Sequence, residues 1–144
     1  MPRYGKTSKT RLAQCHQDLQ VIFNEVIKYT DVSIVCGHRT EQEQTVAFEN
    51  GLSEVQYPYS KHNHWPSFAV DVAPFCGEIN GIDWKDSNSF SRLAGVVDIV
   101  SKQLLDERKI NHRIRWGGDW DSDGRSIDQT FNDLPHFELI PLSV

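Results

Sequence analysis

The chain is short of cysteine, of long apolar runs and of clustered basic residues. Its 144 residues include only three cysteines, far apart and odd in number, so we expect free thiols rather than a disulfide framework. No stretch approaches the roughly 18 consecutive apolar residues of a membrane-spanning helix. Lysine and arginine are scattered, and the net charge is −5. This pattern argues against nucleic acid, and against anionic membrane surfaces, as the main partner.

What the chain does contain is typical of a globular domain. Hydrophobic residues make up 38% of the sequence and aromatic residues 10%, which at this length is enough to bury a core without disulfides. No repeat, low-complexity tract or linker divides the sequence. We therefore predict a single domain over residues 1–144.

The spacing of apolar residues predicts an α+β fold. Three- and four-residue steps predict helices over residues 8–29 and 89–108. Thr40 and Glu43 form a capping box that opens another helix, which is expected to stop at Gly51. Shorter apolar or alternating runs predict strands at residues 32–36, 68–73, 113–116 and 136–140. The expected architecture is a small, largely antiparallel sheet packed with about three helices.

Three polar segments far apart in the chain carry side chains that bind metal ions. They supply His62 or His64, Asp71, and His136. Two imidazoles and one carboxylate are a three-ligand set that leaves the fourth position of a tetrahedral zinc ion open for water. None of the segments contains cysteine, which disfavours a structural zinc site, although manganese and nickel accept the same ligand types.

One additional carboxylate, Asp133, precedes His136 by three residues, where a base that activates water could stand. Residues three apart on a regular strand face opposite sides. We therefore expect Leu134-Pro135 to bend the chain so that Asp133 and His136 converge. The pattern predicts a metallohydrolase.

A second acidic segment, residues 119–124, matches the opening of a calcium loop, with glycine at its sixth position. The twelfth position is Thr130, where such loops carry a bidentate glutamate. Asp119, Asp121 and Asp123 are therefore candidate calcium ligands, and a plain acidic turn is the alternative.

These motifs resemble the VanY-type zinc DD-peptidase family, which includes D-Ala-D-Ala carboxypeptidases and the phage L-alanyl-D-glutamate endopeptidases that act as endolysins. The resemblance implies a Hedgehog-like α+β fold, with zinc held by His62, Asp71 and His136 and with Asp133 as the catalytic base. The segments that carry it follow the family's order: Gly37-His38-Arg39-Thr40 with Gln42 and Gln44, Ser60-Lys61-His62, Ala69-Val70-Asp71, Trp116-Gly117-Gly118-Asp119-Trp120, and Asp133 to Glu138.

The sequence departs from the family pattern at two points. The usual spacing of seven between histidine and aspartate would select His64, whereas Ser-Lys-His-Asn aligns with His62 and implies a two-residue insertion containing Trp65-Pro66. His62 is the preferred ligand and His64 the fallback. Asp133 stands where many of the carboxypeptidases carry glutamate.

The resemblance also implies a substrate, the peptidoglycan stem peptide. Arg39 is the expected clamp for a stem-peptide carboxylate, because its planar fork binds carboxylates bidentately. Ser60 and Gln44 are expected to line the cleft, whereas Trp116 and Trp120 fit core packing as well as substrate contact.

The function predicted is that of a phage-type endolysin with L-alanyl-D-glutamate endopeptidase activity. The alternatives are a D-Ala-D-Ala carboxypeptidase or dipeptidase of the same family, and a non-catalytic, metal-dependent module that only binds wall peptides. We expect a monomer without a separate cell-wall-binding domain. The N-terminal residues lack the apolar core of a signal peptide, so we expect synthesis in the cytoplasm and release to the wall through a membrane pore.

Overall fold

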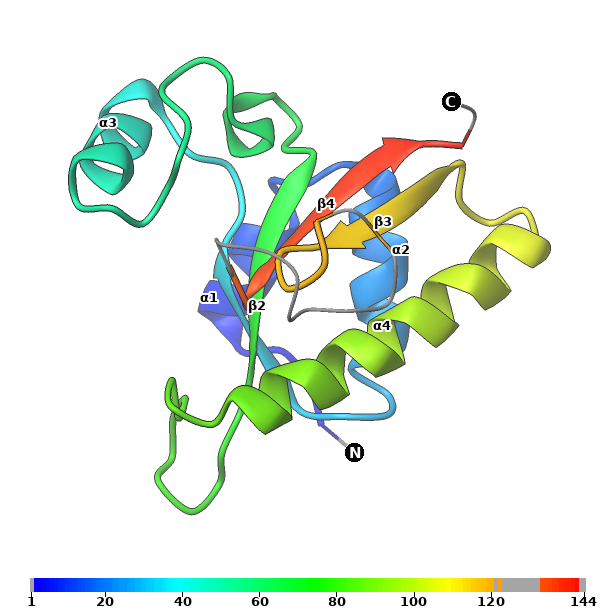
Figure 1. The fold of residues 1–144 in the computed structure, drawn as a ribbon. Coiled ribbons are helices and arrows are strands. Elements are labelled where there is room, and N and C mark those ends of the chain that lie inside the picture. Colours follow the sequence, from blue (N-terminus) through cyan, green and yellow to red (C-terminus); the bar gives the residue numbers. More distant parts are fainter. Residues whose placement is uncertain (1, 121, 123–132, 143–144) are drawn as a thin grey trace.

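The computed structural model of the chain describes residues 2–120, 122 and 133–142 (Figure 1). Among these residues, no helix has both the length and the apolarity needed to cross a bilayer. The elements follow one another in the order α1 (Lys6–Leu12), α2 (Gln17–Val26), β1 (Val32–Cys36), α3 (Glu41–Glu49), the 3-10 helix η1 (Lys61–Asn63), β2 (Ala69–Pro74), α4 (Ser87–Asp106), β3 (His112–Trp116) and β4 (His136–Pro141).

The four strands form one antiparallel sheet in the order β1-β2-β4-β3. This confirms the predicted α+β class with a small antiparallel sheet. The register of the β1–β2 pair shifts between Ile34 and Cys36, where the strand bends toward the segment that follows it. The central strands β2 and β4 are neighbours in space although more than 60 residues separate them in the chain.

The two faces of the sheet differ in character because side chains alternate along each strand. One face joins a single apolar core with α1, α2 and α4, and burial of each large core side chain contributes about 1.5–3 kcal/mol. The ring of Phe23 on α2 contacts Phe137 on β4 with 5.5 Å between centroids. The other face carries Asp71, His136 and Glu138 on the same two strands.

The prediction of one helix over residues 8–29 is wrong, because the chain leaves the helix at residues 13–16. The amide of His16 donates to the carbonyl of Ser67 at 2.8 Å, and the amide of Ser67 donates to the carbonyl of Gln14 at 2.9 Å. The His16 side chain then caps α2 by accepting from the amide of Asp18. The apolar spacing runs through the break because α1 and α2 bury their faces in the same core.

The helix opened by Thr40 is confirmed, with both hydrogen bonds of its capping box present. It ends before Gly51, whose φ of +74° is a conformation that glycine adopts without strain. In Figure 1, α3 stands apart from the helices of the core. The segment after α3 contains η1, which begins behind the capping residue Ser60.

Candidate metal centre and cleft

Three side chains meet on the polar face of the sheet. His62 lies on η1, Asp71 lies on β2, and His136 is the first residue of β4, directly opposite Asp71 in the strand register. Nε2 of His62 is 3.3 Å from Oδ1 of Asp71 and 3.3 Å from Nδ1 of His136. The third side of this triangle, from Nδ1 of His136 to Oδ1 of Asp71, is 3.4 Å.

This triangle fits a metal ion. A tetrahedral ion with bonds of about 2.0–2.1 Å has ligand atoms about 3.3–3.4 Å apart, which matches all three sides. Oδ1 of Asp71 is buried and accepts no hydrogen bond from the residues that the structure describes, which is costly unless a cation binds it. His62, Asp71 and His136 therefore form a group that can hold a metal ion.

Hydrogen bonds on the far side of each ring orient the two imidazoles. Nδ1 of His62 lies 2.7 Å from the carbonyl of Gly37, and Nε2 of His136 lies 2.8 Å from Oε1 of Glu138. Because the carbonyl and the carboxylate only accept, these nitrogens carry protons, and in the neutral rings the lone pairs of the other two nitrogens point into the triangle. A side chain at Gly37 would clash, since a Cβ there would lie 2.3 Å from the carbonyl of Arg11.

Glu138 is a residue whose role the sequence did not indicate beyond its place in a motif. It is buried, and besides His136 it binds Arg115 at 2.7 Å and Lys61 at 3.3 Å, both through Oε2. Burial alone would raise the pKa of Glu138, but the hydrogen bonds with His136 and Arg115 lower it to about 2. Arg115 and Glu138 are cross-strand partners on β3 and β4, and strand alternation places Glu138 on the same face as His136.

The charges of the three metal-binding side chains depend on one another. Burial disfavours a charged His62, yet the Asp71 carboxylate outweighs it and raises the pKa of His62 to about 10. The pKa of His136 is raised in spite of burial, by the neighbouring carboxylates of Asp71 and Glu138. Burial would raise the pKa of Asp71, but the two histidines hold it well below its usual range. A divalent cation that binds here must displace these protons.

Asp133 lies beside this group, as the sequence predicted. Its carbonyl accepts the amide of His136 at 3.0 Å across the turn at Leu134-Pro135, which brings its Oδ2 to 3.9 Å from Nδ1 of His136. Gly117 permits this turn, because a Cβ there would lie 2.0 Å from the carbonyl of Asp133. Burial and the nearby Asp71 raise the pKa of Asp133 to about 6.

Arg39 reaches the site from the segment before α3. Its guanidinium lies 3.4 Å from Oδ2 of Asp71 and donates to Oε1 of Gln44 at 3.0 Å. The prediction that Gln44 lines the cleft is wrong: its side chain is fully buried. It also donates to Ser53 and to the carbonyl of Val55, so that it holds Arg39 and the segment after α3 together.

The other predicted residues divide between the cleft and its surroundings. Ser60 lines the cleft, and its hydroxyl accepts the amide of His62 at 3.2 Å. His64, the fallback ligand, stays outside the metal-binding group and stacks on the ring of Phe68. Trp116 packs against the core, whereas Trp120 lines the cleft with its ring 5.3 Å from that of His136.

A second group of possible ligands, which the sequence did not suggest, consists of His16, Asp18 and His112. Its polar atoms already bind one another. Oδ2 of Asp18 lies 2.8 Å from Nδ1 of His112 and accepts the amide of Asn111 at 2.8 Å, and Nδ1 of His16 accepts the amide of Asp18. These contacts tie the start of α2 to the start of β3, so a structural role accounts for the group.

The calcium prediction falls largely outside the described residues, because Asp121 and Asp123 are not among them. Asp119 is described, and its amide donates to the carbonyl of Trp116 at 3.0 Å. Calcium binding therefore stays a prediction.

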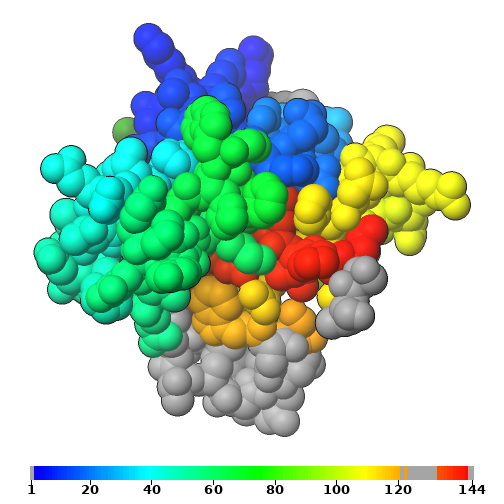
Figure 2. Space-filling view, turned by 90° about the horizontal axis from the view of Figure 1, so that it is seen from above, coloured from blue at the N-terminus to red at the C-terminus, as the bar shows by residue number. Residues whose placement is uncertain are grey.

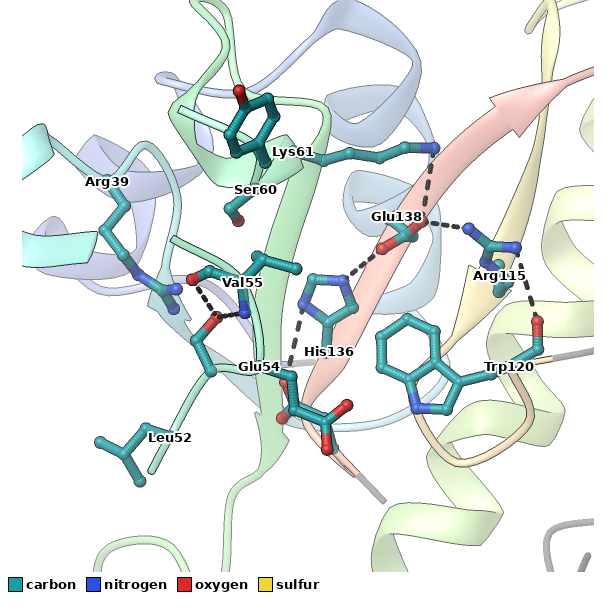
Figure 3. A pocket seen from close by; sticks show the side chains of 13 residues that line it. Arg39, Leu52, Glu54, Val55, Ser60, Lys61, Arg115, Trp120, His136 and Glu138 are labelled. Atoms are coloured by element: carbon teal, nitrogen blue, oxygen red, sulfur yellow. Dashed lines mark hydrogen bonds and ion pairs between the residues drawn. The ribbon is translucent and has the colours of Figure 1, made fainter. Parts of the chain in front are cut away.

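A cleft extends on both sides of the metal-binding group. One cavity of about 480 Å³ is lined by Lys61, Arg115, Trp120, His136 and Glu138 (Figure 3). Another, of about 700 Å³, borders Asp71 and is lined by residues of α3 and by Trp84; both cavities border Arg39 and Asp133. In Figure 2, α3 and the segment after it (cyan to green) lie next to β4 (red) and the end of β3 (orange).

The fold and this site together define a chain built to hold a metal ion at the floor of an open cleft, as metal-dependent hydrolases do. A family model for the phage L-alanyl-D-glutamate peptidases matches residues 1–140, and the chain belongs to this family. The chain is thus an enzyme, a peptidase with endolysin-type activity on peptidoglycan.

A structural comparison shows the same fold in a solved protein. The crystal structure of the L-Ala D-Glu endopeptidase ChiX from Serratia marcescens matches with a TM-score of 0.72 at 21% sequence identity. The match covers 97% of this chain and 90% of that one. No curated protein matches the chain in a sequence comparison. The predicted family and fold class are both confirmed.

Proposed function

We propose that the chain is a zinc-dependent endopeptidase that cleaves the L-alanyl-D-glutamate bond of the stem peptide. His62, Asp71 and His136 hold the zinc ion, and Asp133 is the general base. The observation that carries this proposal is the triangle of ligand atoms with sides of 3.3–3.4 Å, beside which Asp133 stands at 3.9 Å from His136. The family and the fold of ChiX support the choice of bond.

The residues around the ion have separate tasks in hydrolysis. A zinc ion bound here supplies a Lewis acid that polarises the scissile carbonyl and makes a coordinated water acidic. Asp133 accepts the proton of the attacking water and returns it to the leaving nitrogen, so that the peptide bond is exchanged for a carboxylate and an amine. Arg39 binds a substrate carboxylate at the edge of the site. Glu138 and the Gly37 carbonyl hold the imidazoles in the binding tautomer.

Digestion of peptidoglycan tests this function. The purified protein is incubated with sacculi, and mass spectrometry identifies the new termini. New amino termini at D-glutamate are expected, and their release should stop after treatment with a chelator and return with zinc. Release of free D-alanine instead would indicate the carboxypeptidase, and binding without any released product would indicate a wall-binding module. Monomeric state and release through a membrane pore stay predictions from the sequence.

A further inference from the structure

The cleft has two halves of different chemical character, which meet at Arg39 and Asp133. We call the cavity lined by Lys61 and Arg115 the cationic half, and the cavity lined by Val46 and Trp84 the apolar half; Leu52 lines both. Because both border the metal-binding group, a peptide that lies across this group places one end in each half.

In the cationic half, Lys61 and Arg115 stand beside Glu138, and the other charged residues of the lining are Arg39, Glu54 and Asp133. Lys61 and Arg115 both bind the same oxygen of Glu138, at 3.3 Å and 2.7 Å. Two cations therefore share one carboxylate, which His136 also engages. Their side chains are 29% and 32% exposed, so they remain accessible from the cavity (Figure 3). An anionic group of the substrate fits beside Lys61 and Arg115, because these two cations have only one carboxylate oxygen between them.

The apolar half exposes large hydrophobic side chains beside the metal-binding group. Val46 is 54% exposed, Leu52 69% and Trp84 55%. Trp84 is held in place because its ring stacks on the buried Phe90 at 5.8 Å, with 27° between the planes. Exposed apolar side chains that cluster in a cavity mark a binding surface. A fixed aromatic ring fits the apolar face of a sugar or a methyl group.

The stem peptide is divided in the same way about the L-alanyl-D-glutamate bond. On its carboxyl side, D-glutamate continues through its γ-carboxyl group, so its α-carboxylate stays free next to the bond. On its amino side lie the methyl group of L-alanine, then the lactyl group and the N-acetyl sugar of the glycan, all uncharged. Only one residue, about 3.5 Å of chain, separates the bond from the lactyl group.

From this match we propose a direction for the substrate: D-glutamate binds in the cationic half, and the L-alanyl, glycan-linked side lies in the apolar half against Trp84. The inference rests on the proposed function. It assigns Lys61 and Arg115, together with Arg39 where the two halves meet, to the α-carboxylate, and Trp84 to the lactyl and sugar groups. The enzyme then prefers D-glutamate to its α-amide, D-isoglutamine, and prefers stem peptides that are still attached to muramic acid.

Four synthetic substrates test this direction. They combine an N-acetylmuramyl or a plain acetyl group on L-alanine with D-glutamate or D-isoglutamine as the next residue. kcat/KM is measured for the zinc-loaded wild type, for Lys61→Met and for Trp84→Ala. Lys102→Met and Ile99→Ala on α4 are matched controls, because Lys102 and Ile99 are exposed and line neither half of the cleft. Bound zinc is measured for every variant.

The direction predicts that each variant changes one preference only. Lys61→Met should lower kcat/KM on D-glutamate substrates about tenfold more than on the amides, and Trp84→Ala should lower it about fivefold more on muramyl than on acetyl substrates. The controls should keep both wild-type preferences. If either residue had only a structural role, its replacement would lower kcat/KM equally for all four substrates. This result would overturn the assignment.

Two other outcomes are distinct from these. If Lys61→Met changed the muramyl preference and Trp84→Ala the preference for the acid, the substrate would lie in the opposite direction. If the zinc-loaded wild type cleaved none of the four substrates at the L-alanyl bond, the proposed function itself would be rejected.

Discussion

Asp71 and His136 are direct partners across the β2–β4 pair, and their side chains meet on the polar face of the sheet, with Oδ1 of Asp71 3.4 Å from Nδ1 of His136. This relationship makes the metal-binding group part of the sheet rather than of a loop. A shift of one residue in the register would turn one of the two side chains into the apolar core. The rigidity of two central strands thus keeps two ligands at the separation that a tetrahedral ion requires.

Replacing Asp133 should separate metal binding from catalysis. Asp133→Asn keeps the size of the side chain but removes its ability to accept a proton. We expect wild-type zinc content and a loss of kcat of at least about a hundredfold, the usual scale for a general base. Single-turnover hydrolysis together with elemental analysis measures both. Turnover close to the wild type would remove Asp133 from this role.

The two neighbouring histidines should differ in their effect on metal content. His62→Ala removes a nitrogen of the triangle and should reduce bound zinc to well below one ion per chain. His64→Ala only removes a ring that stacks on Phe68, so zinc content and activity should stay close to wild type. Elemental analysis of the purified variants shows which histidine binds zinc. If His64→Ala lost zinc and His62→Ala kept it, His64 would be the ligand.

Glu138 should matter for metal affinity although it lies outside the ligand set. Glu138→Gln weakens the hydrogen bond that orients His136 and leaves Lys61 and Arg115 without their shared anion. A loss of zinc affinity of about 10–100-fold is expected, measured by competition with a chromogenic chelator. Glu107→Gln, an exposed residue after α4, is the control. An affinity equal to that of the control would show that His136 needs no such support.

Stability of the metal-free protein should fall as the pH rises. The pKa of His62 in the folded chain, about 10, lies above its ordinary value of 6.5. Its contribution is therefore complete below pH 6.5 and is lost as the pH approaches 10. After chelation, the thermal midpoint should be at least about 3 °C lower at pH 9.5 than at pH 6.5.

The zinc-loaded protein provides the comparison for this pH effect, because the nitrogen of His62 that titrates in the metal-free protein binds the metal ion instead of a proton. Its midpoint should fall less over the same range. His62→Gln should also reduce the slope of the metal-free protein, since the titrating group is gone. An unchanged slope in this variant would assign the pH dependence to other groups.

Much of the fold followed from local patterns in the sequence. The positions of the four strands and of α4 agree with apolar spacing to within about two residues, because these elements bury one face in the core, whereas α3 followed from its capping box. The prediction of one helix over residues 8–29 is wrong although it used the same kind of spacing. The apolar spacing continues through residues 13–16, but hydrogen bonds with Ser67 interrupt the helix there. Spacing reports which side chains are buried, but not which backbone groups pair with a distant segment.

The sequence by itself determined the kinds of side chain available for chemistry: the imidazoles and carboxylates, the turn that brings Asp133 toward His136, and the cation at Arg39. Tertiary structure alone decided that His62 points into the triangle while His64 points away, that Glu138 supports His136, and that Gln44 is buried behind Arg39. These outcomes depend on strand register and on contacts between segments tens of residues apart. A local pattern has no information about such distances, since they are set only when the strands pair and the core closes.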